Sequence, residues 1–185
     1  MSKSDDLTLA LERSFLASEF LTWLWFRCEV EGGVFDLPSG GVSLAVEDAL
    51  SLASWDDDAL KASLRGGAPT RRPEAANALA SGLLLKKARF ILARDTREWL
   101  FSLDGDTLDL SSVKVVDPDA EEDEDEDPLA TKLAAGEELR GAIDALYGEF
   151  LAQRLDGAWD RVEVPRLREW VRFKLEHASK QVGVA

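Results

Sequence analysis

The apolar positions near the start of the chain follow a helical pattern. Over residues 7–31, large apolar side chains recur at spacings of three and four residues. Between residues 15 and 26 they occupy nearly the whole circumference, and a helix that is apolar on nearly every side is buried on nearly every side. We therefore predict a tryptophan-rich helix that is either the centre of the core or half of an oligomer interface. Gly32 and Gly33 predict its end.

The middle of the chain has the pattern of a sheet. Residues 34–37 and 42–46 flank a Pro-Ser-Gly-Gly turn signal. Residues 88–94 and 99–103 predict a hairpin, and residues 108–115 extend it to a three-stranded meander. Between these regions, the pattern of residues 55–64 predicts a short capped helix or a loop. Pro73 then opens a short helix over 74–82, with Gly82 as its C-cap.

Charge and helical periodicity divide the last third of the chain. Nine acidic residues lie between Asp117 and Asp127, with prolines at 118 and 128, which predicts a solvated acidic linker. A helical stripe covers 129–155, a break follows at Asp156-Gly157, and Pro165 starts a last helix.

This order of elements is typical of an α+β fold rather than of alternating βαβ units. We predict an α+β domain with an antiparallel sheet over residues 1–116, the acidic linker over 117–128, and a helical segment over 129–185 that packs on the same core. The 185 residues, 45% hydrophobic and 31% charged, have a globular composition and suffice for one domain with an appended helical unit.

The net charge of −14 is concentrated in the acidic run, since the rest of the chain carries 27 acids against 22 bases, a net of −5. Surfaces that bind phosphates are usually basic, because neutralised phosphates release their counterions. The overall charge therefore disfavours strong autonomous binding to nucleic acid, but it allows a local basic face.

The single cysteine, Cys28, excludes an intramolecular disulfide, and its apolar surroundings in sequence predict a buried structural thiol. The polar N-terminus lacks the apolar region of a signal peptide, and no apolar stretch approaches the roughly 18–20 residues of a membrane span. We expect a cytoplasmic protein with no membrane partner.

No catalytic motif is recognisable. The sequence lacks a Gly-rich phosphate loop and a GxSxG elbow, and its single histidine, His177, is expected at the surface. Asp104, Asp106 and Asp109 have a spacing that could seat a cation, although Asp-Gly-Asp between two strands is also what a tight turn requires. We expect no enzyme, no cofactor and no metal. A metal-dependent hydrolase built on these carboxylates is the enzymatic alternative.

Basic residues form three groups: around the loop at 65–72, beside the strand at 86–89, and along the last helix from 161 to 174. Such groups could contact phosphates, or they could pair with the acidic run or with helix carboxylates, and the pattern leaves both open. The candidate phosphate or partner contacts are Arg71, Arg72, Lys86, Lys87, Arg166, Arg168, Arg172 and Lys174.

The run Glu-Phe-Leu-Thr-Trp-Leu-Trp at 19–25 resembles a motif in the C-terminal half of RdgC-like, recombination-associated proteins. Similar pieces follow in the same order at 73–75, 86–92, 99–103, 146–151 and 168–170. The resemblance covers most of this chain and about half of such a protein. It implies an α+β domain without catalytic residues, from a family whose better-known members form ring-shaped dimers around duplex DNA and restrain recombinase activity.

We therefore expect a non-enzymatic, recombination-associated accessory protein that contacts double-stranded DNA or a DNA-bound recombination protein. It would act as a homo-oligomer or with a separate chain that supplies the other half of the family's architecture. The alternative is an acidic protein-interaction module that binds a basic partner through residues 117–127 and does not touch DNA.

Overall fold

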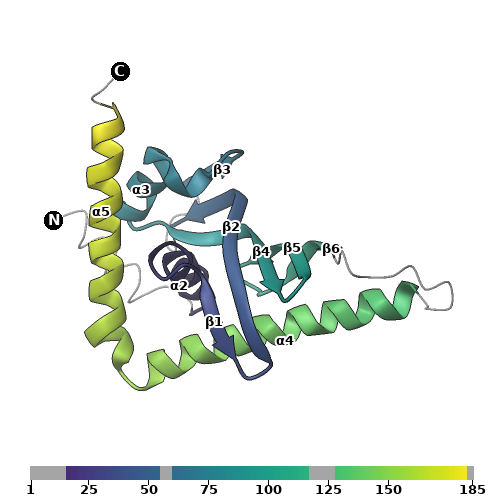
Figure 1. The fold of residues 1–185 in the computed structure, drawn as a ribbon. Coiled ribbons are helices and arrows are strands. Elements are labelled where there is room, and N and C mark those ends of the chain that lie inside the picture. Colours follow the sequence, from purple (N-terminus) through teal and green to yellow (C-terminus); the bar gives the residue numbers. More distant parts are fainter. Residues whose placement is uncertain (1–15, 55–59, 117–127, 183–185) are drawn as a thin grey trace.

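A computed structural model describes residues 16–54, 60–116 and 128–182 of the chain (Figure 1). The helices are α2 (Leu16–Val30), α3 (Pro73–Ala80), α4 (Pro128–Leu155) and α5 (Val164–Val182), with a 3-10 turn, η1 (Pro69–Arg71), and a π-helical segment, η2 (Trp159–Glu163). The strands are β1 (Val34–Leu37), β2 (Gly40–Ala53), β3 (Lys61–Arg65), β4 (Leu84–Arg94), β5 (Arg97–Asp104) and β6 (Leu110–Val116). The predicted α+β class with an antiparallel sheet is confirmed.

Helix α2 lies at the centre of the molecule (Figure 1). Every residue from Ser18 to Phe26 is buried, as the continuous apolar pattern predicted. Around it gather Phe35 of β1 and Phe150 and Trp159 of the C-terminal helical region, with Trp23 and Phe150 having ring centroids 5.7 Å apart. The first helix is therefore the core helix. The part of the predicted helix before Leu16 lies outside the described residues.

The two glycines end α2 as predicted, and both have positive φ angles. The amide of Gly33 donates to the carbonyl of Arg27 at 3.1 Å, and its own carbonyl accepts from the amide of Leu44 at 2.8 Å. A Cβ atom on Gly33 would lie 2.0 Å from the carbonyl oxygen of Leu44. Only glycine allows this close approach between the helix end and β2.

The sheet has six antiparallel strands in the order β1-β2-β4-β5-β6, and β3 pairs with the second half of β2. The predicted meander is confirmed as β4, β5 and β6, and Asp95 turns the first hairpin with a φ of 53°. The prediction for residues 61–64 was wrong. They form β3, because their backbone pairs with β2, and hydrogen bonds to another strand leave no pattern in the local sequence. Residues 55–59 lie outside the described part.

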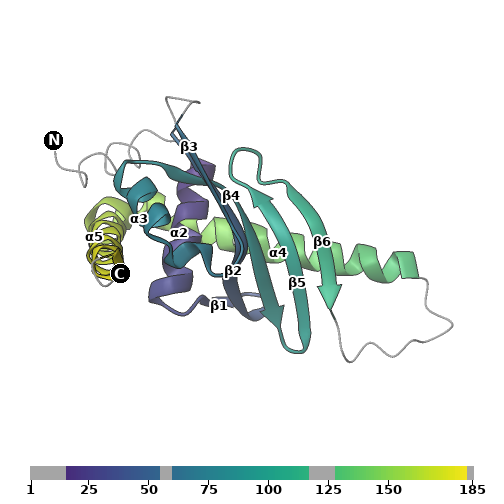
Figure 2. The ribbon, with the colours of Figure 1, turned by 90° about the horizontal axis from the view of Figure 1, so that it is seen from above.

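Alternate residues give the sheet two unlike faces. On β4 and β5, Ala88, Phe90, Leu92, Trp99 and Phe101 are buried against the helices. The indole Nε1 of Trp99 donates to the carbonyl of Ala135 in α4 at 3.0 Å, which places α4 on the same face as α2. Figure 2 shows α4 passing behind the strands, and no described helix lies in front of β4, β5 and β6; we call this near side the open face of the sheet. Strand β6 is the outer edge, and its Val113, Val115 and Val116 are exposed.

The C-terminal helices meet at the predicted break. Gly157 has a φ of 72°, and α5 leaves the end of α4 in a different direction (Figure 1). Pro165 lies at the start of α5, as predicted. Leu139, Leu146 and Phe150 of α4 and Leu167 and Val171 of α5 belong to the same hydrophobic cluster as the sheet. The predicted acidic linker lies outside the described residues apart from Pro128, which begins α4.

None of the described helices is both long enough and apolar enough to cross a bilayer.

Candidate functional site

The eight basic residues singled out by the sequence lie in three places. Arg71, Arg72, Arg166 and Lys174 come together around a groove between α2, α3 and α5. Lys86 and Lys87 lie on β4, away from that groove. Arg168 and Arg172 lie on α5, but neither of them lines the groove. The structure thus brings half of the predicted set together.

The groove has a volume of about 510 Å³, within the usual range for ligand and peptide sites. Its floor is apolar, with Phe26 and Trp170 buried beneath it. Val30 is 49% exposed and Phe173 is 57% exposed, so the groove presents large apolar groups to solvent. The full lining is Phe26, Glu29, Val30, Arg71, Arg72, Ala76, Arg166, Glu169, Trp170, Phe173, Lys174 and His177.

Glu29, near the end of α2, holds α5 in the position where that helix forms one wall of the groove. Its carboxylate accepts from the indole Nε1 atoms of Trp25 at 2.7 Å and Trp170 at 3.0 Å. The ammonium of Lys174 donates to both of its oxygens, at 2.9 and 2.7 Å, and to the carbonyl of Thr70 at 2.7 Å. Burial lowers the pKa of Lys174, and the charge of Glu29 opposes that shift. This cluster joins α2, η1 and α5.

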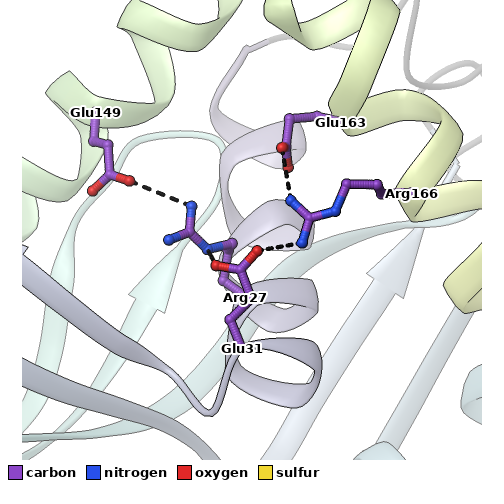
Figure 3. A network of polar contacts seen from close by, with 5 residues as sticks. All are labelled: Arg27, Glu31, Glu149, Glu163 and Arg166. Atoms are coloured by element: carbon purple, nitrogen blue, oxygen red, sulfur yellow. Dashed lines mark hydrogen bonds and ion pairs between the residues drawn. The ribbon is translucent and has the colours of Figure 1, made fainter.

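A second set of contacts holds Arg166, which lines the groove, in place. It is a chain of alternating charges (Figure 3). Arg27 bridges Glu149 of α4, at 3.3 Å, and Glu31, which also pairs with Arg166. Arg166 in turn donates to Glu163 at 3.0 Å. The hydrogen bond with Glu31 raises the pKa of Arg166. Alternating signs give the three inner charges, Arg27, Glu31 and Arg166, an opposite partner on both sides, so this chain of charges ties α2, α4, η2 and α5 together.

Arg71 and Arg72 form the opposite wall. The Nη2 atom of Arg72 donates to the carbonyls of Arg65 and Gly66, at 3.0 and 3.1 Å, which positions this side chain against the preceding loop. Ala68 begins the turn with a φ of 49°. Among the described residues, Arg71 has no side-chain hydrogen bond or ion pair. It is therefore the cation of the groove that a ligand could reach without displacing a partner.

The open face of the sheet carries a second hollow, of about 470 Å³. Arg65, Lys87, Arg89 and Lys114 surround it, and Asp48 is its single carboxylate. Arg89 has weak contacts with carboxylates, at 3.5 Å to Asp48 and 4.0 Å to Glu47. Arg65, Lys87 and Lys114 have no side-chain partner among the described residues. The hydroxyls of Ser51, Ser63, Ser102 and Ser112 line the same hollow.

Sequence reasoning found Lys87 of this set as a candidate and missed Lys114 and the serines. The alternation of buried and exposed positions along the strands could have identified this face. The positions between the buried residues of β4 and β5 are occupied by Lys87, Arg89, Leu100 and Ser102. The register then aligns Leu100 with Lys114 across β5 and β6. That register depends on pairing between strands, which a single strand pattern does not specify.

Lys86 has a structural role. Its ammonium lies 2.6 Å from Asp106 in the β5–β6 turn. Asp104 holds that turn by accepting from the amides of Asp106 at 2.9 Å and Thr107 at 3.3 Å. These are the contacts of a tight turn. In the part of the chain that the structure describes, no group of three or more histidine, cysteine, aspartate or glutamate side chains could hold a metal ion.

A buried ion pair links α2 to α4. Glu19 is fully buried, and its Oε2 lies 3.0 Å from Nη2 of Arg154, whose guanidinium lies 5.2 Å from the ring centroid of Trp159. A buried charge needs such a partner, because the unpaired carboxylate would lose its hydration without compensation. This carboxylate lies in the packed core and lines neither hollow.

Comparison with protein-family models, with curated proteins and with solved structures finds no match to this chain.

Proposed function

We propose that this chain is a non-enzymatic, recombination-associated accessory protein that contacts the phosphate backbone of duplex DNA with the open face of its sheet. The observation that carries the proposal is the second hollow, where four cations and four hydroxyls surround a single carboxylate. Lysine, arginine and serine side chains are the groups that bind phosphates in protein–DNA interfaces. The recombination context is supported by the resemblance of residues 19–25 to RdgC-like proteins.

The chemistry of this face favours binding without sequence readout. Its cations rise from a sheet rather than from a helix that could enter the major groove, and phosphate contacts carry no sequence information. The net charge of −14 opposes the approach of DNA, so the affinity is expected to be modest and to depend steeply on salt.

The salt dependence of duplex binding tests this proposal. Four phosphate contacts predict a slope of about −3 to −4 in a plot of log K against log salt concentration, at about −0.9 for each contact. Lys87→Ala and Lys114→Ala should each weaken binding and reduce the magnitude of the slope by about 1. Fluorescence anisotropy with a labelled 20-base-pair duplex measures both.

Lys132→Ala is the matched control, because this substitution removes the same charge from an exposed residue of α4 that does not line the hollow. Its slope should equal that of the unaltered protein. If all three variants weaken binding equally, the effect is one of net charge, and the sheet face is not the binding surface.

The acidic run supports a competing function as an interaction module. Nine carboxylates within residues 117–127 could capture a basic partner without DNA. If the chain has this function, deletion of residues 118–126 abolishes binding of a lysine-rich peptide. Neither the unaltered protein nor the deletion variant would then bind duplex DNA. Under the function proposed here, the deletion instead strengthens duplex binding, because it removes like charge from a chain that must approach phosphates.

A further inference from the structure

The groove between α2, α3 and α5 combines an apolar floor with a basic rim. The apolar surface consists of Phe26, Val30, Trp170 and Phe173, and the ring of Phe173 lies tilted against that of His177, with their centroids 3.8 Å apart. The lining holds four basic side chains and two carboxylates, Glu29 and Glu169. An occupant that complements this surface needs an apolar side chain and negative charge together.

The walls of the groove are held in place before any ligand arrives. Lys174 is engaged by Glu29 and the carbonyl of Thr70, and Arg166 is engaged by Glu31 and Glu163. These contacts fix α5 against α2 and η1, so binding would cost little ordering of the walls. The same contacts pair Lys174 with Glu29 and Arg166 with Glu31 and Glu163, so Arg71 and Arg72 are the cations of the lining that have no carboxylate partner among the described residues.

Arg71 is the contact through which the rim would recognise charge. It lies on η1 beside the apolar floor, and no described residue pairs with its guanidinium. A guanidinium binds a carboxylate through two parallel hydrogen bonds, and such charge-assisted bonds are shorter and stronger than neutral ones. The neighbouring Arg72 adds a second positive charge on the same wall.

We propose that this groove binds a short acidic segment of a partner protein, with an aromatic side chain of that segment on the floor formed by Phe26, Val30, Trp170 and Phe173 and a carboxylate on Arg71. The inference goes beyond the proposed contact with DNA and rests on a different surface. It assigns the protein a second partner class, which would allow one molecule to hold a protein and a duplex at once.

Two other occupants fit the groove less well. The chain's own acidic run, residues 117–127, has no apolar side chain larger than that of Ala120, so it offers nothing to the floor. A second copy of the chain carries the same net charge of −14, which disfavours its approach at low salt. An acidic, aromatic peptide meets both requirements of the surface.

Fluorescence anisotropy of a labelled model peptide tests the assignment. The probe is a fluorescein-labelled peptide of three aspartates followed by leucine, proline and phenylalanine with a free carboxyl end. The full-length protein should bind it, and binding should weaken at least about tenfold when the probe's phenylalanine is replaced by serine or its aspartates by asparagines.

Two variants of the protein locate the site. Arg71→Glu and Phe173→Ser should each weaken binding of the probe about tenfold or more, because one reverses the recognising charge and the other removes exposed apolar surface. Both side chains lie outside the packed core. Arg172→Glu is the matched control, since it makes the same charge change at an exposed residue of α5 that does not line the groove. Leu155→Ser is the control for loss of an exposed apolar side chain.

The outcomes separate this inference from the DNA proposal. Loss of peptide binding in Arg71→Glu with an unchanged slope of duplex binding supports it. Equal losses in Arg71→Glu and Arg172→Glu would show attraction to general positive charge and overturn it. Peptide binding that appears only after removal of residues 1–12 would assign the groove to the chain's own N-terminal segment and would also overturn it. A change in sedimentation coefficient on Phe173→Ser would mean that the groove takes a second copy.

Discussion

Cys28 lies on α2 close to the groove, beside a smaller hollow lined by Trp25, Ala45 and Thr70. Its thiol packs against the hydrophobic cluster and is only partly accessible. Burial raises the pKa of this thiol from 9.0 to about 12, with the neighbouring charge of Glu29 adding to the shift. Because the thiolate is the nucleophile, Cys28 is a poor candidate for covalent chemistry.

Alkylation kinetics test this assignment. At pH 8.5 a pKa near 12 leaves about a thousandfold less thiolate than a pKa of 9.0. Iodoacetamide should therefore modify the native protein at least about a hundredfold more slowly than the same protein in concentrated urea, as followed by mass spectrometry. A native rate within tenfold of the unfolded rate would mean that Cys28 is accessible and reactive.

For single residues, the sequence identified those whose role depends only on the conformation of the neighbouring backbone. Gly32 and Gly33 end α2, and Pro73 opens α3, because backbone conformation alone demands them. Glu29 could not be identified in this way. Its donors Trp170 and Lys174 lie 141 and 145 residues away along the chain, so its role as a hub exists only once α5 has packed on α2.

The helical elements depend on one another through the charge chain at the end of α2. The guanidinium of Arg27 lies over the rings of Trp23 and Phe35, 5.1 Å from each centroid. The chain of charges therefore also packs against the aromatic core. Glu31 is the only anion in it that touches two cations among the described residues, Arg27 and Arg166. Its loss leaves two guanidinium groups each short of one partner.

We expect Glu31→Gln to lower the free energy of unfolding by about 1 to 2 kcal/mol, a value reduced by the partial exposure of the pair. Glu98→Gln is the control, because Glu98 is exposed on β5, and it should change stability by less than about 0.5 kcal/mol. Urea unfolding followed by circular dichroism measures both. Equal changes in the free energy of unfolding for the two variants would mean that the chain of charges contributes no measurable stability.

Sequence patterns found the long elements and failed at β3. Three aspartates at 56–58 resemble the start of a helix, and only five residues of strand follow them in the fold. The strand forms because Leu64 is buried opposite Leu50 and the backbone completes a ladder with β2. A short strand that depends on a distant partner carries too little local signal to be distinguished from a loop.

The whole molecule has a core to which all its layers contribute. Phe150 of α4 touches Phe20 and Trp23 of α2 and Trp159 of η2, and the same cluster includes Phe90 and Phe101 of the sheet. Because the C-terminal helices share this core, their loss would expose α2. We expect the helices and the sheet to unfold together rather than as two units.

Phe150→Ala should therefore lower the free energy of unfolding by about 3 to 5 kcal/mol, the usual range for removing a buried aromatic side chain. Far-ultraviolet circular dichroism and tryptophan fluorescence should report one shared transition at a lower urea concentration. Leu155→Ala, at the exposed end of the same helix, should leave the midpoint nearly unchanged. Separate transitions for the two signals would mean that the helices form an independent unit.

At the scale of the molecule, pattern and resemblance both indicated the α+β class, which is confirmed. The groove and the basic sheet face were not predicted as surfaces, because each is assembled from segments distant in sequence. Arg71 and Phe173 meet across the groove only through the packing of α3 on α5, and Lys87 and Lys114 share a hollow only through the register of the sheet.

No described strand pairs with the outer edge of β6, and this edge has a consequence for handling the protein. Three exposed valines lie on this edge strand, whose outer backbone groups make a template onto which another copy could add its own edge. We expect the nine carboxylates that follow this strand in sequence to oppose such pairing, because an assembly of two copies would bring together two runs of negative charge. Acidification or high salt weakens that repulsion, so fibrous or amorphous precipitation should set in first under those conditions, and storage at neutral pH and low ionic strength should prevent it.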